Sequence, residues 1–79
     1  MNIKVLFFGV LHDVLGIDEM NFSLENATTI DSFTSKLLKT YPELKKYGFS
    51  VAVNEVYSKP DFILQDGHVV ALIPPVSGG

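Results

Sequence analysis

A run of apolar residues, interrupted by a single lysine, opens the chain and has the composition of a β-strand. Residues 3–8 are rich in Val, Phe, Ile and Leu, and successive side chains of a strand point to opposite faces. The odd-numbered positions are all apolar, whereas Lys4 shares the even-numbered face with Leu6 and Phe8. Because lysine is seldom buried without a partner, we expect this second face to open to solvent or to another protein. Leu6 and Phe8 are therefore candidates for exposed apolar side chains.

The next segment has the apolar spacing of a short helix. In residues 10–16 the apolar positions recur at intervals of one helical turn, and Gly16 is a typical C-terminal stop, so we expect one or two turns. His12 and Asp13 are neighbours there, and neighbours on a helix point in different directions. The chain has only two histidines and no third ligand type at metal spacing. We therefore expect neither a metal site nor a catalytic pair at this position.

A longer apolar stripe over residues 30–41 predicts the main helix. Thr28 or Thr29 is expected to cap it, with Thr28 and Asp31 forming a variant of the capping box. Pro42 is expected to end it or to start the next turn. The stripe consists of Ile30, Phe33, Leu37, Leu38 and Tyr41.

Three further segments have the composition of strands. Residues 20–24 alternate between apolar and polar, residues 50–53 form a short apolar run, and residues 68–73 are apolar nearly throughout, as in a central strand. Turns are expected at residues 54–55 and at residues 65–67, where Gly67 supplies the permissive backbone. The expected chain therefore runs strand, short helix, strand, main helix, strand, strand.

The first and last strands are the most apolar, so we expect them to pair at the centre of a mixed sheet. One amphipathic helix would cover one face, and a short helix would follow the first strand. This arrangement is an α+β fold, a β-grasp roll of the ubiquitin kind. We expect residues 1–73 to form this domain and residues 74–79 to form an extended tail.

The last six residues have a composition unlike the rest of the chain. Pro74 and Pro75 lack the N–H that a strand needs and favour an extended conformation, so they should hold residues 76–79 away from the body. Gly78 and Gly79 have no Cβ and can thread a passage too narrow for other residues. Most polar termini carry no function, but an apolar residue followed by Gly-Gly favours one. We expect the Gly79 carboxylate to serve as a chemical handle.

The amino-acid composition excludes several classes of reactive site. The 79 residues suffice for one small domain and include no cysteine, which removes thiolate nucleophiles, zinc–thiolate sites and Fe–S clusters. If this protein handles sulfur, it must do so through its C-terminal carboxyl group. The sequence shows no phosphate loop and no nucleophile–base constellation, so we expect no turnover by the chain alone.

Charge and hydropathy argue against nucleic acid and membranes as partners. The net charge is −3, arginine is absent and the six lysines do not form the basic patch that nucleic acid needs. No apolar run approaches the roughly 18 residues that span a bilayer, and the N-terminal run is too short for a signal peptide. We therefore expect no nucleic acid, no membrane and a cytoplasmic location.

Over its whole length the chain resembles the small subunit of molybdopterin synthase, a MoaD-like sulfur carrier of the ubiquitin-like β-grasp family. Four segments carry the resemblance in order and spacing, and the ending Pro-Pro-Val-Ser-Gly-Gly is the most specific. The segments are residues 3–8, 51–54, 64–67 and 70–79.

The resemblance implies a chemistry for Gly79. In that family an E1-like (MoeB-like) enzyme uses ATP to adenylate the terminal glycine, and sulfur from a donor protein then displaces AMP to leave a thiocarboxylate. The tail enters the large (MoaE-like) subunit and donates sulfur to cyclic pyranopterin monophosphate, which becomes the dithiolene of molybdopterin. The chain would thus be a non-catalytic subunit of a sulfurtransferase complex. It would hold no intrinsic cofactor, only covalent sulfur on Gly79.

The resemblance also assigns roles to particular positions. Gly79 would carry the adenylate and then the thiocarboxylate, and the rest of the tail would fit the passage into the large subunit. An apolar surface would dock that subunit, and two large subunits would form the middle of a heterotetramer. The passage residues are Pro75, Val76, Ser77 and Gly78, and the docking residues are Phe8, Tyr57 and Ile73.

Two positions depart from the pattern of this family. His12-Asp13 stands where the family commonly has Arg-Glu, and His68 stands where it usually has an acidic residue.

Three alternative functions stay open. A thiazole-pathway sulfur carrier shares the fold and Gly-Gly, but generally lacks the short helix and the Pro-Pro pair. A ubiquitin-like modifier conjugated to lysines through Gly79 stays open, since both chemistries begin with an adenylated Gly-Gly. A plain interaction module would use the open sheet face and have no need of the tail.

Overall fold

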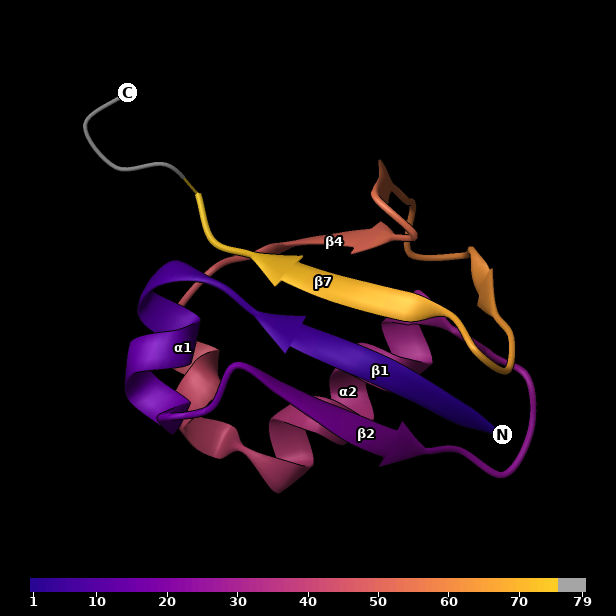
Figure 1. Ribbon diagram of the computed structural model, residues 1–79, viewed down its shortest axis with the longest axis horizontal. Coiled ribbons are helices and arrows are strands. Elements are labelled where there is room, and N and C mark those ends of the chain that lie inside the picture. The colour runs from indigo at the N-terminus through magenta and orange to yellow at the C-terminus, as the bar shows by residue number, and fades with distance from the viewer. Residues whose placement is uncertain (76–79) are drawn as a thin grey trace.

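The computed structural model describes residues 1–75, and Val76–Gly79 lie outside the described residues. A five-stranded mixed sheet forms one layer and a single long helix packs across one of its faces, so the predicted α+β class is confirmed (Figure 1). A second sheet has two short strands. The elements in chain order are β1 (Asn2–Phe7), α1 (Gly9–Leu15), β2 (Glu19–Ser23), β3 (Thr28–Thr29), α2 (Ile30–Thr40), a 3₁₀ helix (Pro42–Lys46), β4 (Ser50–Val53), β5 (Val56–Tyr57), β6 (Ile63–Leu64) and β7 (Val69–Ile73).

The large sheet has the strand order β2-β1-β7-β4-β5, with β1 and β7 parallel to each other at its centre. Strand β2 pairs antiparallel with β1, and β4 pairs antiparallel with both β7 and β5. The expected central pairing of the first and last strands is therefore confirmed. These two strands have a neighbour on each side in the sheet, and this central position accounts for their nearly continuous apolar sequences.

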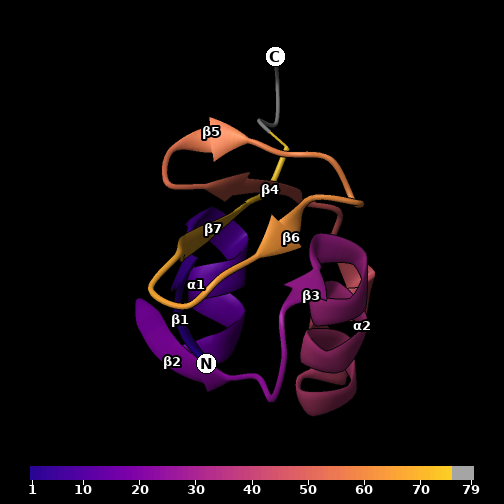
Figure 2. The same ribbon diagram turned by 90° about the vertical axis from the view of Figure 1, so that its right-hand side faces the viewer.

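The core lies between the sheet and α2, on the face that carries the odd-numbered residues of β1 (Figure 2). Phe33 of α2 is fully buried, and its ring meets that of Phe22 edge to face, with centroids 5.3 Å apart. Helix α1 closes one end of this core through Leu11 and ends at Gly16, whose φ of 72° is the left-handed C-terminal stop that the sequence predicts. The fully buried side chains include Ile3, Val5, Leu11, Phe33, Leu37, Leu44, Leu64, Val70 and Leu72.

Thr29 caps α2, because its Oγ1 accepts a hydrogen bond from the backbone N–H of Ser32 at 3.1 Å. The predicted capping box of Thr28 and Asp31 is wrong. Thr28 belongs to β3, where it pairs with Leu64, and only Thr29 has the extended backbone of a cap together with a side chain aimed at the helix. The helix ends at Thr40, just before Pro42, as expected.

Replacing Thr29 by Ala should lower the free energy of unfolding by about 1 kcal/mol, because the N–H of Ser32 loses its acceptor. Urea denaturation followed by circular dichroism measures this loss. Thr28→Ala is the matched control, since the Thr28 side chain makes no cap, and it should cost less. Equal losses in the two variants would contradict the assignment of Thr29 as the cap.

The small sheet of β3 and β6 has no counterpart among the strands that the sequence predicts. Each strand has two residues, too few for an alternating pattern, and the pairing depends on how residues 60–64 lie beside the start of α2. There, the N–H of Ile30 donates to the carbonyl of Phe62 at 2.9 Å. Within residues 1–75, no helix is long and apolar enough to cross a membrane.

Candidate functional site

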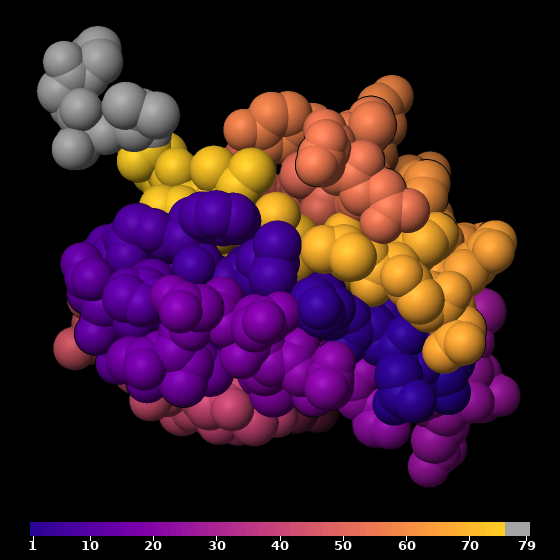
Figure 3. Space-filling view, in the orientation of Figure 1, coloured from indigo at the N-terminus to yellow at the C-terminus, as the bar shows by residue number. Residues whose placement is uncertain are grey.

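The face of the large sheet opposite α2 is open and hollowed. The hollow has a volume of about 610 Å³ and spans the sheet from β1 across β7 to β4 and β5. Figure 3 views the molecule from this side, with the yellow surface of β7 between the indigo of β1 and the orange of the β4–β5 hairpin. The lining residues are Leu6, Phe8, Ala52, Asn54, Glu55, Tyr57, Val69, Ala71 and Ile73.

The strand register explains the shape of this hollow, which we call the sheet groove. Ala71 of β7 lies between Leu6 and Ala52, and Ala52 in turn pairs with Tyr57. The two alanines contribute little bulk at the centre of the row. Phe8 is 47% exposed and Tyr57 is 66% exposed, so two aromatic rings flank a shallow apolar floor. Exposed apolar surface of this kind is a candidate interaction site.

The structure brings the three predicted docking residues around this one groove. Phe8 follows the end of β1, Tyr57 comes from β5, and Ile73 is the last residue of β7, directly before Pro74 and Pro75. The sequence argument from Lys4 found only Phe8 and Leu6. Their role in docking stays a prediction.

The predicted tail residues are placed only in part. Pro75 is exposed and Pro74 is half-buried, and Val76, Ser77, Gly78 and Gly79 lie outside the described residues. The root of the tail packs closely, because a Cβ built on Gly9 would lie 3.0 Å from Cγ of Pro74. The chain after Ile73 therefore leaves the sheet beside Phe8, at the rim of the groove. The division into residues 1–73 and a tail of residues 74–79 stays a prediction.

The β4–β5 turn forms another part of the rim. Asn54 and Glu55 have φ angles of 48° and 72°, so both occupy the left-handed region that two-residue hairpin turns require. Asn54 fixes the turn to β7, since its backbone N–H donates to the carbonyl of Val69 at 2.8 Å and its Oδ1 accepts from the Val69 N–H at 2.9 Å. Glu55 makes no comparable bond within residues 1–75, and it is exposed at the edge of the groove.

Replacing Glu55 by Gly should raise the free energy of unfolding by about 0.5–1 kcal/mol. The left-handed backbone costs about 1–2 kcal/mol for an L-residue, and the larger chain entropy of glycine offsets part of the gain. Thermal and urea denaturation measure the difference. Glu55→Ala keeps the strain and should show no such gain. A loss of stability in Glu55→Gly would mean that the carboxylate stabilises the turn.

A smaller hollow of about 460 Å³ adjoins the sheet groove at Leu6 and Phe8 and also contacts His12, Asp18 and Glu19. His12 Nε2 lies 2.9 Å from Oδ1 of Asp18, and His12 Nδ1 lies 3.3 Å from Oδ1 of Asp13. The expectation that His12 and Asp13 point apart is therefore wrong. Both are exposed enough for their side chains to bend toward each other at the helix surface. No group of three or more potential metal ligands occurs among the described residues.

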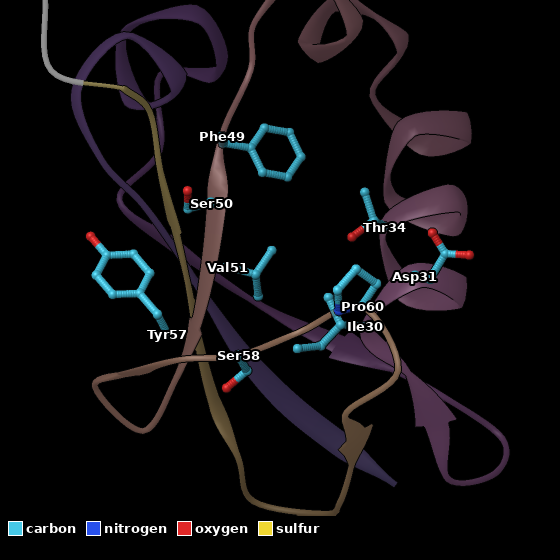
Figure 4. Close-up of a pocket in the computed structure, with 9 residues that line it drawn as sticks. All are labelled: Ile30, Asp31, Thr34, Phe49, Ser50, Val51, Tyr57, Ser58 and Pro60. Atoms are coloured by element: carbon cyan, nitrogen blue, oxygen red, sulfur yellow. The ribbon is translucent and has the colours of Figure 1, made fainter.

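A third hollow, of about 380 Å³, lies between α2 and the edge of β4 (Figure 4). Figure 4 shows Ile30, Thr34 and Pro60 on one side of β4, whereas the ring of Tyr57 lies on the opposite side of that strand. The hollow is shallow and mixes serine, threonine and aspartate with apolar side chains. It has no convergent set of polar groups, so the sheet groove is the stronger candidate.

A mixed sheet with a parallel central pair, one helix across one face and a free opposite face defines a ubiquitin-like β-grasp protein. The chain belongs to the ThiS family, whose model matches residues 5–79. It is 34% identical to the molybdopterin synthase sulfur carrier subunit of Chlamydomonas reinhardtii over the full length of both chains.

Two solved structures are similar in fold. One is a putative molybdopterin converting factor, subunit 1, from Pyrococcus furiosus, with 27% identity and a TM-score of 0.87 over 96% of this chain and 99% of that one. The other is a protein–protein complex of subunits 1 and 2 of molybdopterin-converting factor from Helicobacter pylori. The matched chain of that complex is 24% identical, with a TM-score of 0.72 over all of both chains, which shows a common fold. The predicted β-grasp fold is thereby confirmed.

Proposed function

We propose that this chain is the sulfur carrier subunit of a molybdopterin synthase, and not an enzyme by itself. The observation that carries the proposal is that the sheet groove adjoins Pro74 and Pro75, the described root of the tail. Ile73 lines the groove and continues through Pro74 and Pro75 into Val-Ser-Gly-Gly. The likeness to a curated sulfur carrier over the whole chain supports it.

In this proposal the Gly79 carboxylate attacks the α-phosphorus of ATP on an E1-like enzyme, and pyrophosphate leaves. Hydrosulfide delivered by a donor protein then adds to the acyl carbon and AMP departs, so the carboxylate becomes a thiocarboxylate with no change in the oxidation state of sulfur. A carboxylate is a poor electrophile, and adenylation supplies the leaving group that it lacks. The chain provides no cysteine for an alternative thiol route.

The large subunit would then bind the sheet groove through Phe8, Tyr57 and Ile73. Docking would place the tail residues Pro75–Gly78 in the passage to the acceptor, cyclic pyranopterin monophosphate. Tethering raises the effective concentration of the thiocarboxylate at the acceptor far above that of the free protein. The rigid hairpin and the packed root of the tail limit the conformational entropy that binding must remove.

Reconstitution tests the proposal directly. The full chain is incubated with the E1-like enzyme of the same cell, ATP and a sulfide source, and its intact mass is measured. We expect the exchange of one oxygen for sulfur, localised to Gly79 by fragmentation, and then formation of the dithiolene when the large subunit and the cyclic precursor are added. A chain that is never adenylated would contradict the carrier role.

The same reaction separates the alternatives. Thiazole formation in place of the dithiolene would identify a thiazole-pathway carrier. Lysine-linked adducts that appear with ATP and disappear with deletion of Gly78-Gly79 would identify a modifier.

A further inference from the structure

The turn between β4 and β5 carries a glutamate where its backbone favours glycine. Two-residue hairpin turns with both φ angles positive are best served by asparagine followed by glycine. Asn54 fits the first of these positions, but Glu55 occupies the second with a φ of 72°. A left-handed backbone is strained for a residue with a Cβ, and strain of this kind is often retained where a side chain has a function. The Glu55 side chain is therefore a candidate for a role outside the turn itself.

The described part of the chain gives the Glu55 carboxylate no structural role. Within residues 1–75, no side-chain hydrogen bond or ion pair joins it to another group. The residue is exposed, so its ionised carboxylate remains hydrated in the isolated chain. For folding alone, glycine would suit this position better.

The turn holds Glu55 at a fixed place beside the sheet groove. Asn54 is bonded twice to the backbone of Val69 in the central strand β7, at 2.8 and 2.9 Å. Figure 2 shows the β4–β5 hairpin at one end of the molecule, where β5 forms an edge of the large sheet. Glu55 lines the groove there together with Tyr57. A partner would thus meet a carboxylate whose backbone is already ordered, which limits the entropy lost on binding.

The two sides of the open face differ in charge. On the side of β1 and β2, Lys4 and Glu19 lie 3.4 Å apart and offset each other. On the side of β4 and β5, the Glu55 carboxylate has no such counterpart among the described residues. The floor between the two sides is apolar, with Ala71 at its centre. A partner surface that covers this floor is complementary to the β5 side if it carries a cationic side chain there.

We propose that Glu55 is a specificity-determining residue of the docking surface and pairs with a lysine or arginine of the large subunit. This inference rests on the proposed function, in which the large subunit covers the groove. The pair lies at the rim of the apolar contact, so it acts on the rate of association and disfavours partners that are acidic at this place. It takes no part in the transfer of sulfur from Gly79.

Binding kinetics at two salt concentrations test this pair. Surface plasmon resonance of the full-length chain on the immobilised large subunit gives the rate constants for the wild type, Glu55→Gln and Glu55→Gly. At about 50 mM salt we expect both variants to bind about fivefold to tenfold more weakly, mainly through slower association, and at about 500 mM salt the difference should fall below about twofold. Glu25→Gln is the matched control, since Glu25 is exposed in a bend and does not line the groove.

Glu55→Gly separates a binding role from a structural one. It should unfold at a higher urea concentration than the wild type and still bind as weakly as Glu55→Gln, because it relieves the strain and removes the charge. A purely structural residue would not lose affinity while the chain gains stability.

The outcomes distinguish this inference from the proposed function. Wild-type affinity in Glu55→Gln, tighter binding by it, a loss that salt does not reduce, or an equal loss in Glu25→Gln would each overturn the role of Glu55. In all four cases the wild-type chain still binds the large subunit and still gains sulfur at Gly79, so the carrier role stands. A wild-type chain that does not bind the large subunit at either salt concentration would overturn both.

Discussion

Adding one alanine after Gly79 should abolish sulfur transfer while leaving the fold intact. The extension replaces the glycine carboxylate with a peptide bond and moves the new carboxylate about 3.5 Å further along the chain. It also places a Cβ at the end of a tail whose last two residues have none. Because reacting groups must meet at near-contact distance, a shift of this size is enough to lose the reaction.

The measurement is the rate of dithiolene formation by the reconstituted synthase, together with the intact mass of the carrier after activation. An alanine inserted after Asn26, in an exposed bend, is the matched control, because it adds the same residue without changing the tail. We expect the control to fold and to transfer sulfur normally. Normal transfer by the extended chain would show that the Gly79 carboxylate is not the group that carries sulfur.

Phe8→Asp should weaken binding of the large subunit by about a hundredfold and barely change stability. The ring of Phe8 is 47% exposed and lines the groove, so an aspartate there costs little in the free protein. In the complex it would place a carboxylate in an apolar contact, at a cost of about 3 kcal/mol, which corresponds to the hundredfold loss. Calorimetric titration with the large subunit measures the affinity, and thermal unfolding measures the stability.

Two other phenylalanines provide the controls. Phe33→Ala removes a fully buried ring of the core and should cost about 3–5 kcal/mol of stability. Phe62→Asp introduces the same charge at an exposed ring outside the groove and should leave binding unchanged. If Phe8→Asp lowers the melting temperature as Phe33→Ala does, Phe8 is a core residue, and the docking surface must lie elsewhere.

The hydrophobic pattern of a single segment was sufficient to predict the elements that are long enough to show several repeats of that pattern. The stripe over residues 30–41 predicts α2, and the apolar runs at both ends of the chain predict the central pair β1 and β7. The exposure of Phe8 also follows from local sequence, since Lys4 two pleats away marks the open face. Each of these features depends on side-chain alternation along one segment, which the sequence displays directly.

The hydrophobic pattern of one segment could not predict the side-chain contacts at the ends of helices and strands. The sequence allowed Thr28 and Thr29 equally as caps, and the pairing of Thr28 with Leu64 decides between them. The contacts of His12 with Asp13 and Asp18 depend on the path of the chain after Gly16, which returns Asp18 beside the helix. Strands β3 and β6 pair where the carbonyls of Pro60 and Phe62 accept from the first N–H groups of α2, a contact between segments far apart in sequence.

The sequence by itself determined the fold class, the family resemblance and the ending Pro-Pro-Val-Ser-Gly-Gly, because these depend on residue order along the chain. Only the tertiary structure decided that Phe8, Tyr57 and Ile73 surround one groove with an alanine floor. They come from three separate segments (the residue after β1, strand β5 and the end of β7), and their proximity depends on the pairing of β1 with β7 and of β7 with β4, a register set by burial of the opposite face.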